Sequence, residues 1–324
     1  MQNVPVIGID ISKKTFDVCA IFNGKNKTCS FNNNETGCKE FISWIKKFDF
    51  IDSHICMEST GCYSEFVAEC LYNFGYKVSV TNPLQIKSFR LSKMIRQKTD
   101  KSDCEVIAMF CLQNSPALWT PKPRENRELQ EINARINALQ MELNRLINAL
   151  EKEILNGIVA NSIHEEMNFV KDMIKKLEQE AFNIINGSPK LKRQFSILTA
   201  IKGVGPKTAM TILSDMPDVS CFKTAKQYAA FAGLTPSHIQ SGTSVKGKSH
   251  ISRMGSKKIR KALYMSALVV KNHNNNFQAF VKRLVDKGKR PKVIIVAIMR
   301  KMLHIFFGIL KSNAFFKQNM AFQA

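Results

Sequence analysis

The hydrophobic positions of residues 4–118 alternate between strand-like and helix-like spacing. Three apolar segments with short gaps come first, and their spacing predicts strands joined by hairpins. The predicted strands are Val4–Ser12, Phe16–Phe22, Lys27–Phe31, His54–Met57 and Lys77–Val80, and the predicted helices are Asn34–Phe48, Tyr63–Phe74, Leu84–Met94 and Ser102–Leu112. Three strands followed by alternating helices and strands is the element order of an RNase H-like α/β domain.

The next stretch has the most regular pattern of the chain. Prolines at positions 116, 121 and 123 mark a linker, and beyond it apolar residues recur in alternating steps of three and four. The series is Leu129, Ile132, Ile136, Leu139, Leu143, Leu146 and Leu150, and after Gly157 it continues with Met167, Val170, Ile174, Leu177, Ala181 and Ile184. Such heptads give a helix one apolar stripe that packs against another helix. The partner helix belongs either to a hairpin within the same chain or to a second chain. We expect an α/β domain at 1–118, a linker and coiled-coil arm at 119–186, and an all-α basic domain at 187–324.

The positive charge lies almost entirely in the last of these domains. The chain has 48 Lys and Arg against 26 Asp and Glu, a formal net charge of +22. Residues 187–324 hold 25 of the basic residues and only three acidic ones, whereas residues 1–186 are balanced. A basic domain beside a neutral one indicates a polyanionic partner, and nucleic acid is the first candidate.

Other features argue against a membrane or secreted protein. The best apolar stretch, Val293–Leu310, contains Arg300, Lys301 and His304, so we expect a buried helix there. The N-terminus shows no charged and then apolar leader. The nine cysteines are scattered and form no C-x-x-C pair, which is typical of reduced thiols. A cytoplasmic location without a membrane partner is therefore expected.

Four acidic residues are candidates for a metal site. Asp10 ends the first apolar strand and Glu58 follows the fourth, and these strands are neighbours in a sheet of the predicted kind. Asp100 and Asp103 are three residues apart at the start of a helix, so they share one helix face. Four carboxylates together require divalent cations, and oxygen ligands suit Mg²⁺ or Mn²⁺, which promote reactions at phosphorus. Taken singly, each acid also fits a helix N-terminus or a turn, but the set favours the metal site.

Residues 196–210 predict a contact with phosphate. An apolar helix ends at Lys202-Gly203-Val204-Gly205, and Pro206 stands where the first residue of a helix belongs. Two glycines allow a ligand close to the backbone, and the next helix offers free N–H groups. This pattern is that of a helix-hairpin-helix that binds nucleic acid, and the alternative is an ordinary corner between helices. The residues expected to bind are Lys202, Gly203, Gly205, Lys207 and Thr208.

A serine lies at the start of the strongly basic segment 241–267. Ser241 and Gly242 open a loop rich in cations, and such cations stabilise the transition state when a hydroxyl attacks a phosphodiester. A Ser-Gly pair is also routine in turns, and the residues alone favour that interpretation. The cations expected to bind nucleic acid are Lys246, Lys248, Arg253, Lys257, Lys258 and Arg260.

Six ordered segments give the chain a resemblance to a known family. They are GIDIS (8–12), ESTGCY (58–63), KTDKSD (98–103), GVGPKTA (203–209), AGLTP (232–236) and SG (241–242). Over essentially its whole length the chain resembles the transposases of the insertion-sequence 110/1111 family, relatives of the Piv DNA invertase. The resemblance implies a RuvC-like N-terminal domain whose Mg²⁺-binding tetrad is here Asp10, Glu58, Asp100 and Asp103. It also implies that Ser241 is a nucleophile, which reverses the preference drawn from the residues alone.

The resemblance further implies an activity and its partners. Members of the family recombine DNA through a transient phosphoserine link, assemble as dimers or tetramers through the coiled-coil arm, and use a structured guide RNA that pairs with donor and target DNA. We therefore expect a Mg²⁺-dependent DNA transposase or site-specific recombinase. The alternatives are a RuvC-like, Holliday-junction-type endonuclease without serine chemistry and a non-catalytic nucleic-acid-binding protein. One departure is Arg253-Met254-Gly255-Ser256, where relatives commonly have Lys-x-Gly-Asn, so the role of that asparagine is in question here.

Overall fold

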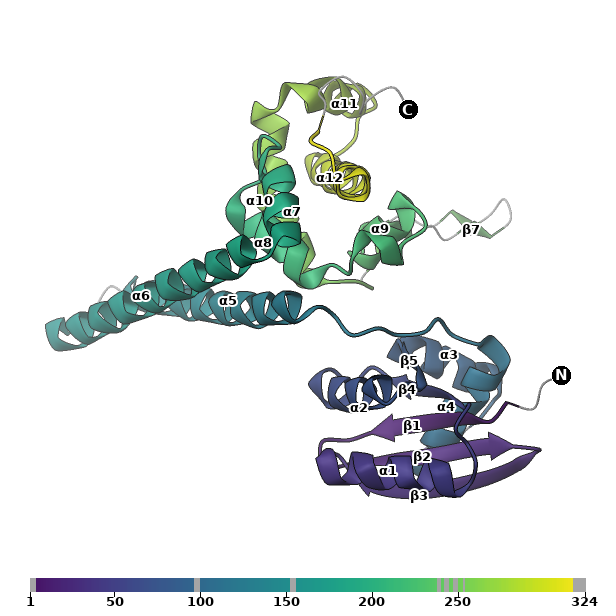
Figure 1. Cartoon of the computed structure of the whole chain (residues 1–324). Helices are drawn as coiled ribbons and strands as arrows, with labels where there is room; N and C mark the ends of the chain where they lie inside the picture. Colours follow the sequence, from purple (N-terminus) through teal and green to yellow (C-terminus); the bar gives the residue numbers. More distant parts are fainter. Residues whose placement is uncertain are drawn as a thin grey trace. The chain divides into compact units, whose positions relative to one another are not determined.

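The chain folds into two compact units. In the computed structural model of the protein, the described residues are 4–95, 100–151, 156–237, 240–241, 245–246, 250–252 and 254–316. Unit 1 comprises Met1–Lys122 and unit 2 comprises Pro123–Ala324. Figure 1 shows that unit 1 is built from a sheet and helices and that unit 2 consists mainly of helices.

The centre of unit 1 is a five-stranded sheet in the order β3-β2-β1-β4-β5. β1, β2 and β3 are antiparallel, whereas β4 and β5 run parallel to β1. All five predicted strands are confirmed, and so is the predicted pairing of the first strand with the fourth. The strands are β1 (Val6–Ile11), β2 (Thr15–Phe22), β3 (Lys25–Asn32), β4 (His54–Glu58) and β5 (Lys77–Thr81).

Helices cover both faces of this sheet. They are α1 (Glu35–Lys47), α2 (Cys62–Asn73), α3 (Pro83–Ser92) and α4 (Asp100–Asn114). On one face α1 and α2 bury apolar residues such as Phe41 and Leu71, and on the other α3 and α4 bury Ile86 and Ile107. These layers confirm the predicted mixed α/β architecture, and they leave α4 lying on β1, β2 and β4.

The two long helices of unit 2 pack against each other. α5 (Arg124–Leu150) and α6 (Gly157–Gly187) meet along the predicted apolar positions. Their shared cluster contains Ile136, Leu139 and Leu146 from α5 and Met167, Val170 and Ile174 from α6. At the other end of the pair, Leu129, Ala181 and Ile185 join the core of the following helices. The apolar heptad side chains of α5 are therefore buried against those of α6 in the same chain.

The remaining helices of unit 2 share one core. They are α7 (Pro189–Thr199), α8 (Pro206–Asp215), the 3₁₀ turn η1 (Val219–Cys221), α9 (Ala225–Phe231), α10 (Lys257–His273), α11 (Asn275–Asp286) and α12 (Pro291–Ser312). Among the described helices, α12 alone has the length and apolar composition to cross a membrane. Of that apolar stretch, 61% is buried, and α12 packs on α7, α9 and α10. α12 is thus a core helix, as its charged residues predicted.

Candidate functional site

Two of the predicted acids lie at neighbouring positions in the sheet of unit 1. β1 and β4 pair with Ile9 opposite Met57, so Asp10 and Glu58 are the next residues on the two strands. Because side chains alternate along a strand, both carboxylates project to the same face of the sheet. Both side chains are half-buried. The sheet therefore brings these two carboxylates together where the two parallel strands end.

A glycine allows α4 to lie directly on this face. A Cβ atom on Gly8 would be 2.2 Å from the carbonyl oxygen of Cys104, so a larger residue would push the helix off β1. Asp10 follows two residues later on the same face. The pKa of the Cys104 thiol is raised by its hydrogen bond with Cys19, then by burial, and further by the carboxylates of Asp17 and Asp10. These carboxylates therefore lie near the first turns of α4.

Asp17 is an acid of this site that the sequence analysis missed. The antiparallel register of β1 and β2 places Asp17 directly opposite Asp10. The register is fixed by a tight turn in which the Ser12 backbone N–H donates to the Thr15 carbonyl at 2.9 Å. The signal was present in the sequence, because two strands joined by so short a turn pair in a narrow range of registers.

The other two predicted acids come from the first turn of α4. The carboxylate of Asp103 forms an ion pair with the guanidinium of Arg90 on α3. Asp100 is the first residue of α4, and its side chain lies outside the described part of the structure. Within that described part, no three His, Cys, Asp or Glu side chains form a group able to hold a metal ion. The structure thus brings Asp10 and Glu58 together, adds Arg90 beside Asp103, and leaves the fourth acid undescribed.

The glycine turn of unit 2 lies between two helices, since α7 ends at Thr199 and α8 begins at Pro206, where a helix start is predicted. Gly203 has a φ of 101°, and a Cβ atom there would be 2.6 Å from the side chain of Val270 on α10. The carbonyl of Lys202 accepts a hydrogen bond of 2.8 Å from the amide of the buried Asn274. This turn therefore packs tightly on α10, which explains the glycine at 203 without any ligand.

Two further residues of the predicted phosphate contact have partners within unit 2. The ammonium of Lys207 pairs with Glu178 on α6 at 2.9 Å. The hydroxyl of Thr208 is buried and lies 2.8 Å from that of Ser266 on α10. Lys202 and Gly205 are exposed. Thr208 belongs to the packing between helices, whereas Lys202 and Gly205 remain on the surface.

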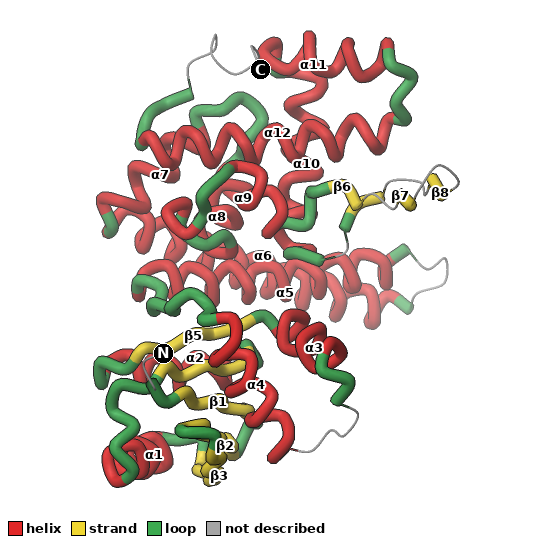
Figure 2. The backbone as a smooth tube through the Cα atoms, turned by 90° about the vertical axis from the view of Figure 1, so that its right-hand side faces the viewer, coloured by secondary structure: helices red, strands yellow, loops and turns green. Residues whose placement is uncertain are grey.

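Ser241 lies in a narrow antiparallel arm, and this is a difference from the all-helical unit expected for residues 187–324. β6 (Pro236–Ser237) pairs with β9 (His250–Ile251), and β7 (Gln240–Ser241) pairs with β8 (Val245–Lys246). Residues 236–251 are rich in serine, threonine and glycine, which are poor helix formers, and the described residues of this segment pair as strands instead. Figure 2 shows β6, β7 and β8 extending away from the helices of unit 2. The side chains of Ser241 and Lys246, and all of Lys248 and Arg253, lie outside the described residues.

Two glycines hold the base of this arm together. A Cβ atom on Gly255, whose φ is 124°, would be 2.3 Å from the backbone nitrogen of Gly233. The guanidinium of Arg260 donates to the carbonyl of Ala232 at 3.1 Å, so this predicted nucleic-acid contact has a structural partner. Ser256 begins α10 by accepting a hydrogen bond from the backbone N–H of Ile259. An asparagine at this position would cap the helix in the same way, so the serine at 256 keeps the capping role of the residue that relatives commonly have. Beside it, Lys257 and Lys258 are exposed.

The chain is similar to DNA-rearranging proteins over almost its whole length. Residues 7–159 match a DEDD-type IS110 transposase domain, and residues 195–282 match "Transposase IS116/IS110/IS902 family". The pilin gene-inverting protein of Moraxella bovis is 36% identical over 322 residues, which cover 95% of this chain and 96% of that protein. The same figures hold for the pilin gene-inverting protein of Moraxella lacunata. The transposase of insertion sequence element IS1111A from Coxiella burnetii is 20% identical over 96% of this chain and 90% of its own length.

Proposed function

Because the chain belongs to the IS116/IS110/IS902 family of transposases, we propose that it cuts and rejoins DNA as a transposase or site-specific recombinase. The observation that carries this proposal is the neighbouring position of Asp10 and Glu58 on the face that α4 covers. Clustered carboxylates of this kind are what metal-assisted phosphodiester chemistry requires. Relatives named for gene inversion and transposition support DNA as the partner.

A divalent cation, Mg²⁺ or Mn²⁺, is the proposed cofactor, and the carboxylates of Asp10, Glu58, Asp100 and Asp103 would hold it. All four donors offer oxygen atoms, which suit these ions. Two half-buried carboxylates at neighbouring positions also favour a cation between them. When bound, the cation draws charge from the phosphate oxygens. Arg90 orients Asp103 from the side of α3.

Ser241 is the proposed nucleophile. The proposal rests on the family resemblance and on the place of Ser241 in the arm that Gly233 and Gly255 anchor. A bond forms between the serine oxygen and phosphorus as the bond to one strand oxygen breaks, and the hydroxyl proton ends on that leaving oxygen. Attack by another strand end reverses the step and joins the DNA. The exposed Lys257 and Lys258 supply positive charge within the same unit.

The resemblance supports further parts of the proposal. A structured guide RNA would pair with donor and target DNA, and the exposed Lys202 and Gly205 would contact nucleic-acid backbone in a helix-hairpin-helix manner. The RuvC-like N-terminal domain would act within a dimer or tetramer in the cytoplasm. Since α5 and α6 fill each other's apolar positions, such an oligomer would use other surfaces of these helices.

A trapped covalent adduct tests the serine chemistry. The protein is incubated with Mg²⁺ and a plasmid that carries its gene with the natural flanking DNA, denatured, and analysed for DNA linked to protein. We expect an adduct with the natural chain and with the control variant Ser237→Ala, which changes another serine of the same arm. We expect none with Ser241→Ala. Cleaved DNA without an adduct in all three proteins would favour the endonuclease alternative, and binding without cleavage would favour a non-catalytic role.

The guide RNA is tested separately. The protein is purified from its host, and the nucleic acid that remains bound is sequenced. A discrete RNA encoded beside the gene is the expected result. Bound RNA drawn at random from the transcriptome would contradict a dedicated guide.

A further inference from the structure

A hollow of about 480 Å³ lies on unit 2 where α7, η1 and the end of α12 meet. The residues that line it include neither the acids of unit 1 nor any residue of the antiparallel arm that carries Ser241. Its walls include the apolar residues Pro189, Val219 and Leu310, and its charged groups are Lys190, Arg193, Lys311 and Asp218. Three cations and one carboxylate give this lining a net positive charge.

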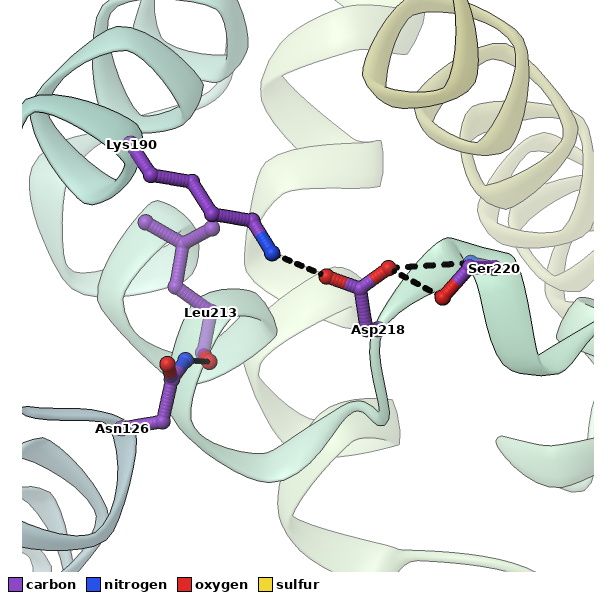
Figure 3. A network of polar contacts seen from close by, with 5 residues as sticks. All are labelled: Asn126, Lys190, Leu213, Asp218 and Ser220. Atoms are coloured by element: carbon purple, nitrogen blue, oxygen red, sulfur yellow. Dashed lines mark hydrogen bonds and ion pairs between the residues drawn. The ribbon is translucent and has the colours of Figure 1, made fainter. Parts of the chain in front are cut away.

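The carboxylate in the hollow is already neutralised. Lys190 pairs with Asp218 at 2.7 Å, and the backbone N–H and hydroxyl of Ser220 donate to the other carboxylate oxygen at 3.0 and 2.8 Å, as Figure 3 shows. Burial alone would raise the pKa of Asp218, but the hydrogen bonds from Lys190 and Ser220 outweigh burial and lower it. Asp218 therefore stays ionised and holds Lys190 in place, which leaves Arg193 and Lys311 to attract an anion.

An exposed aromatic ring lies beside these cations. The guanidinium carbon of Arg193 is 4.5 Å from the ring centre of Phe315, whose side chain is 46% exposed. Arg193 also donates to the carbonyl of Asn313 at 3.3 Å, which fixes the plane of the guanidinium. A planar cation on an aromatic ring is a surface on which a nucleobase stacks.

We propose that this hollow binds one nucleotide of a single-stranded nucleic acid. Arg193 and Lys311 contact its phosphate, and its base lies over the apolar walls next to Phe315. Contacts with a duplex backbone need only surface cations, whereas apolar walls and an exposed ring favour an unpaired base. The inference takes from the proposed function only that nucleic acid is the partner, and it needs no cleavage.

Binding of short labelled oligonucleotides to the full chain tests this site. The probes are a 12-nucleotide oligo(dT), a 12-nucleotide oligo(U) and a 12-base-pair DNA duplex, each measured by fluorescence anisotropy at several salt concentrations. The pocket variant is Arg193→Ala/Lys311→Ala, and its control is Lys282→Ala/Lys287→Ala, which removes two exposed lysines of unit 2. Phe315→Leu tests the ring, and Phe231→Leu, at another exposed phenylalanine, is its control.

The pocket variant should lose about tenfold in affinity for at least one of the single strands, whereas the charge control loses about two- to threefold. Phe315→Leu should weaken single-strand binding about fivefold and leave duplex binding unchanged. Thermal melting of each variant within a few degrees of the natural chain shows that the fold is kept. Equal losses in pocket and control variants would overturn the proposal, and so would an equal loss on the duplex, because the hollow would then hold duplex phosphate. These binding measurements involve no DNA cleavage, so their failure would be distinguishable from a failure of the proposed function.

Discussion

The guanidinium of Arg90 on α3 pairs with the carboxylate of Asp103 on α4, and neither side chain is more than 15% exposed. This pair joins two helices that lie on the same face of the sheet in unit 1. It also fixes one of the acids proposed to hold a divalent cation. The position of that acid therefore depends on α3, an element that carries none of the four proposed ligands.

Replacing Arg90 should destabilise unit 1 and misplace Asp103. Removing one member of a poorly exposed ion pair leaves the other without compensation, so Arg90→Ala should lower the free energy of unfolding by about 1–3 kcal/mol. Both tryptophans, Trp44 and Trp119, belong to unit 1, so urea unfolding followed by tryptophan fluorescence reports on this unit. The double variant Arg90→Ala/Asp103→Asn should recover part of the loss. Additive losses in the double variant would show that the two residues are not coupled.

The glycines at 203 and 205 should differ in their effect on stability. In Gly203→Ala the alanine would have to adopt a positive φ, and its Cβ atom would lie 2.6 Å from the side chain of Val270. This substitution should therefore lower the stability of unit 2 by about 1–3 kcal/mol. Gly205 has an ordinary φ of −83° and open space around it, so Gly205→Ala should cost only a few tenths of a kcal/mol to about 1 kcal/mol. Urea unfolding followed by circular dichroism at 222 nm measures both. A smaller loss at 203 than at 205 would contradict the packing described for this turn.

Two adjacent residues of α5 test how its apolar positions are used. Leu146 is buried against α6, whereas Ile147 is 38% exposed. Leu146→Ala should lower the free energy of unfolding by about 2–5 kcal/mol, and Ile147→Ala by less than about 1 kcal/mol. Sedimentation should be the same for both variants, because the contact is within one chain. A change of oligomeric state in Leu146→Ala without a loss of stability would assign this position to an interface between chains.

The stability of unit 1 should fall in mild acid. Burial lowers the pKa of His54 below its ordinary value of 6.5, and the positive charge of Lys77 lowers it further. The folded protein therefore binds this proton more weakly than the unfolded chain does, so the contribution of His54 is fully present above pH 6.5 and is lost as the pH falls below it. His54→Gln, which can still bond to the Ser79 hydroxyl 2.8 Å away, should flatten the pH dependence of urea unfolding between pH 5 and 7.5. An unchanged slope in this variant would assign the acid sensitivity to other groups.

The elements of unit 1 were predictable because its inner strands are short, mostly apolar runs and its helices carry clear start signals. The Asn34 and Asn82 side chains cap α1 and α3 close to the predicted starts. β3 begins at Lys25, two residues earlier than predicted, because this end of the strand is exposed and polar and so lacks an apolar pattern. The local hydrophobic pattern therefore predicts where these strands and helices begin and end to within a few residues.

The contacts between distant segments were not predictable in the same way. Nothing in the local pattern indicates that Arg90 meets Asp103 or that the Thr208 hydroxyl turns toward Ser266. The heptads of α5 and α6 fit a partner helix from the same chain or from another one, and only the fold selects the first. The role proposed for Ser241 rests on the family resemblance, since Ser-Gly alone is typical of turns.

DNA joining by an acid-site variant tests the central claim most directly. The natural chain, Asp10→Asn, and the control Asp52→Asn, at an exposed acid in a turn before β4, are compared with Mg²⁺ on a plasmid that carries the gene and its flanking DNA. Filter binding measures DNA affinity, and amplification across the new junction measures recombination. We predict that Asp10→Asn loses recombination by more than about a hundredfold while its DNA affinity changes less than about threefold, and that Asp52→Asn matches the natural chain. Full recombination by Asp10→Asn would contradict the assignment of the carboxylates of unit 1 to the cutting and rejoining of DNA.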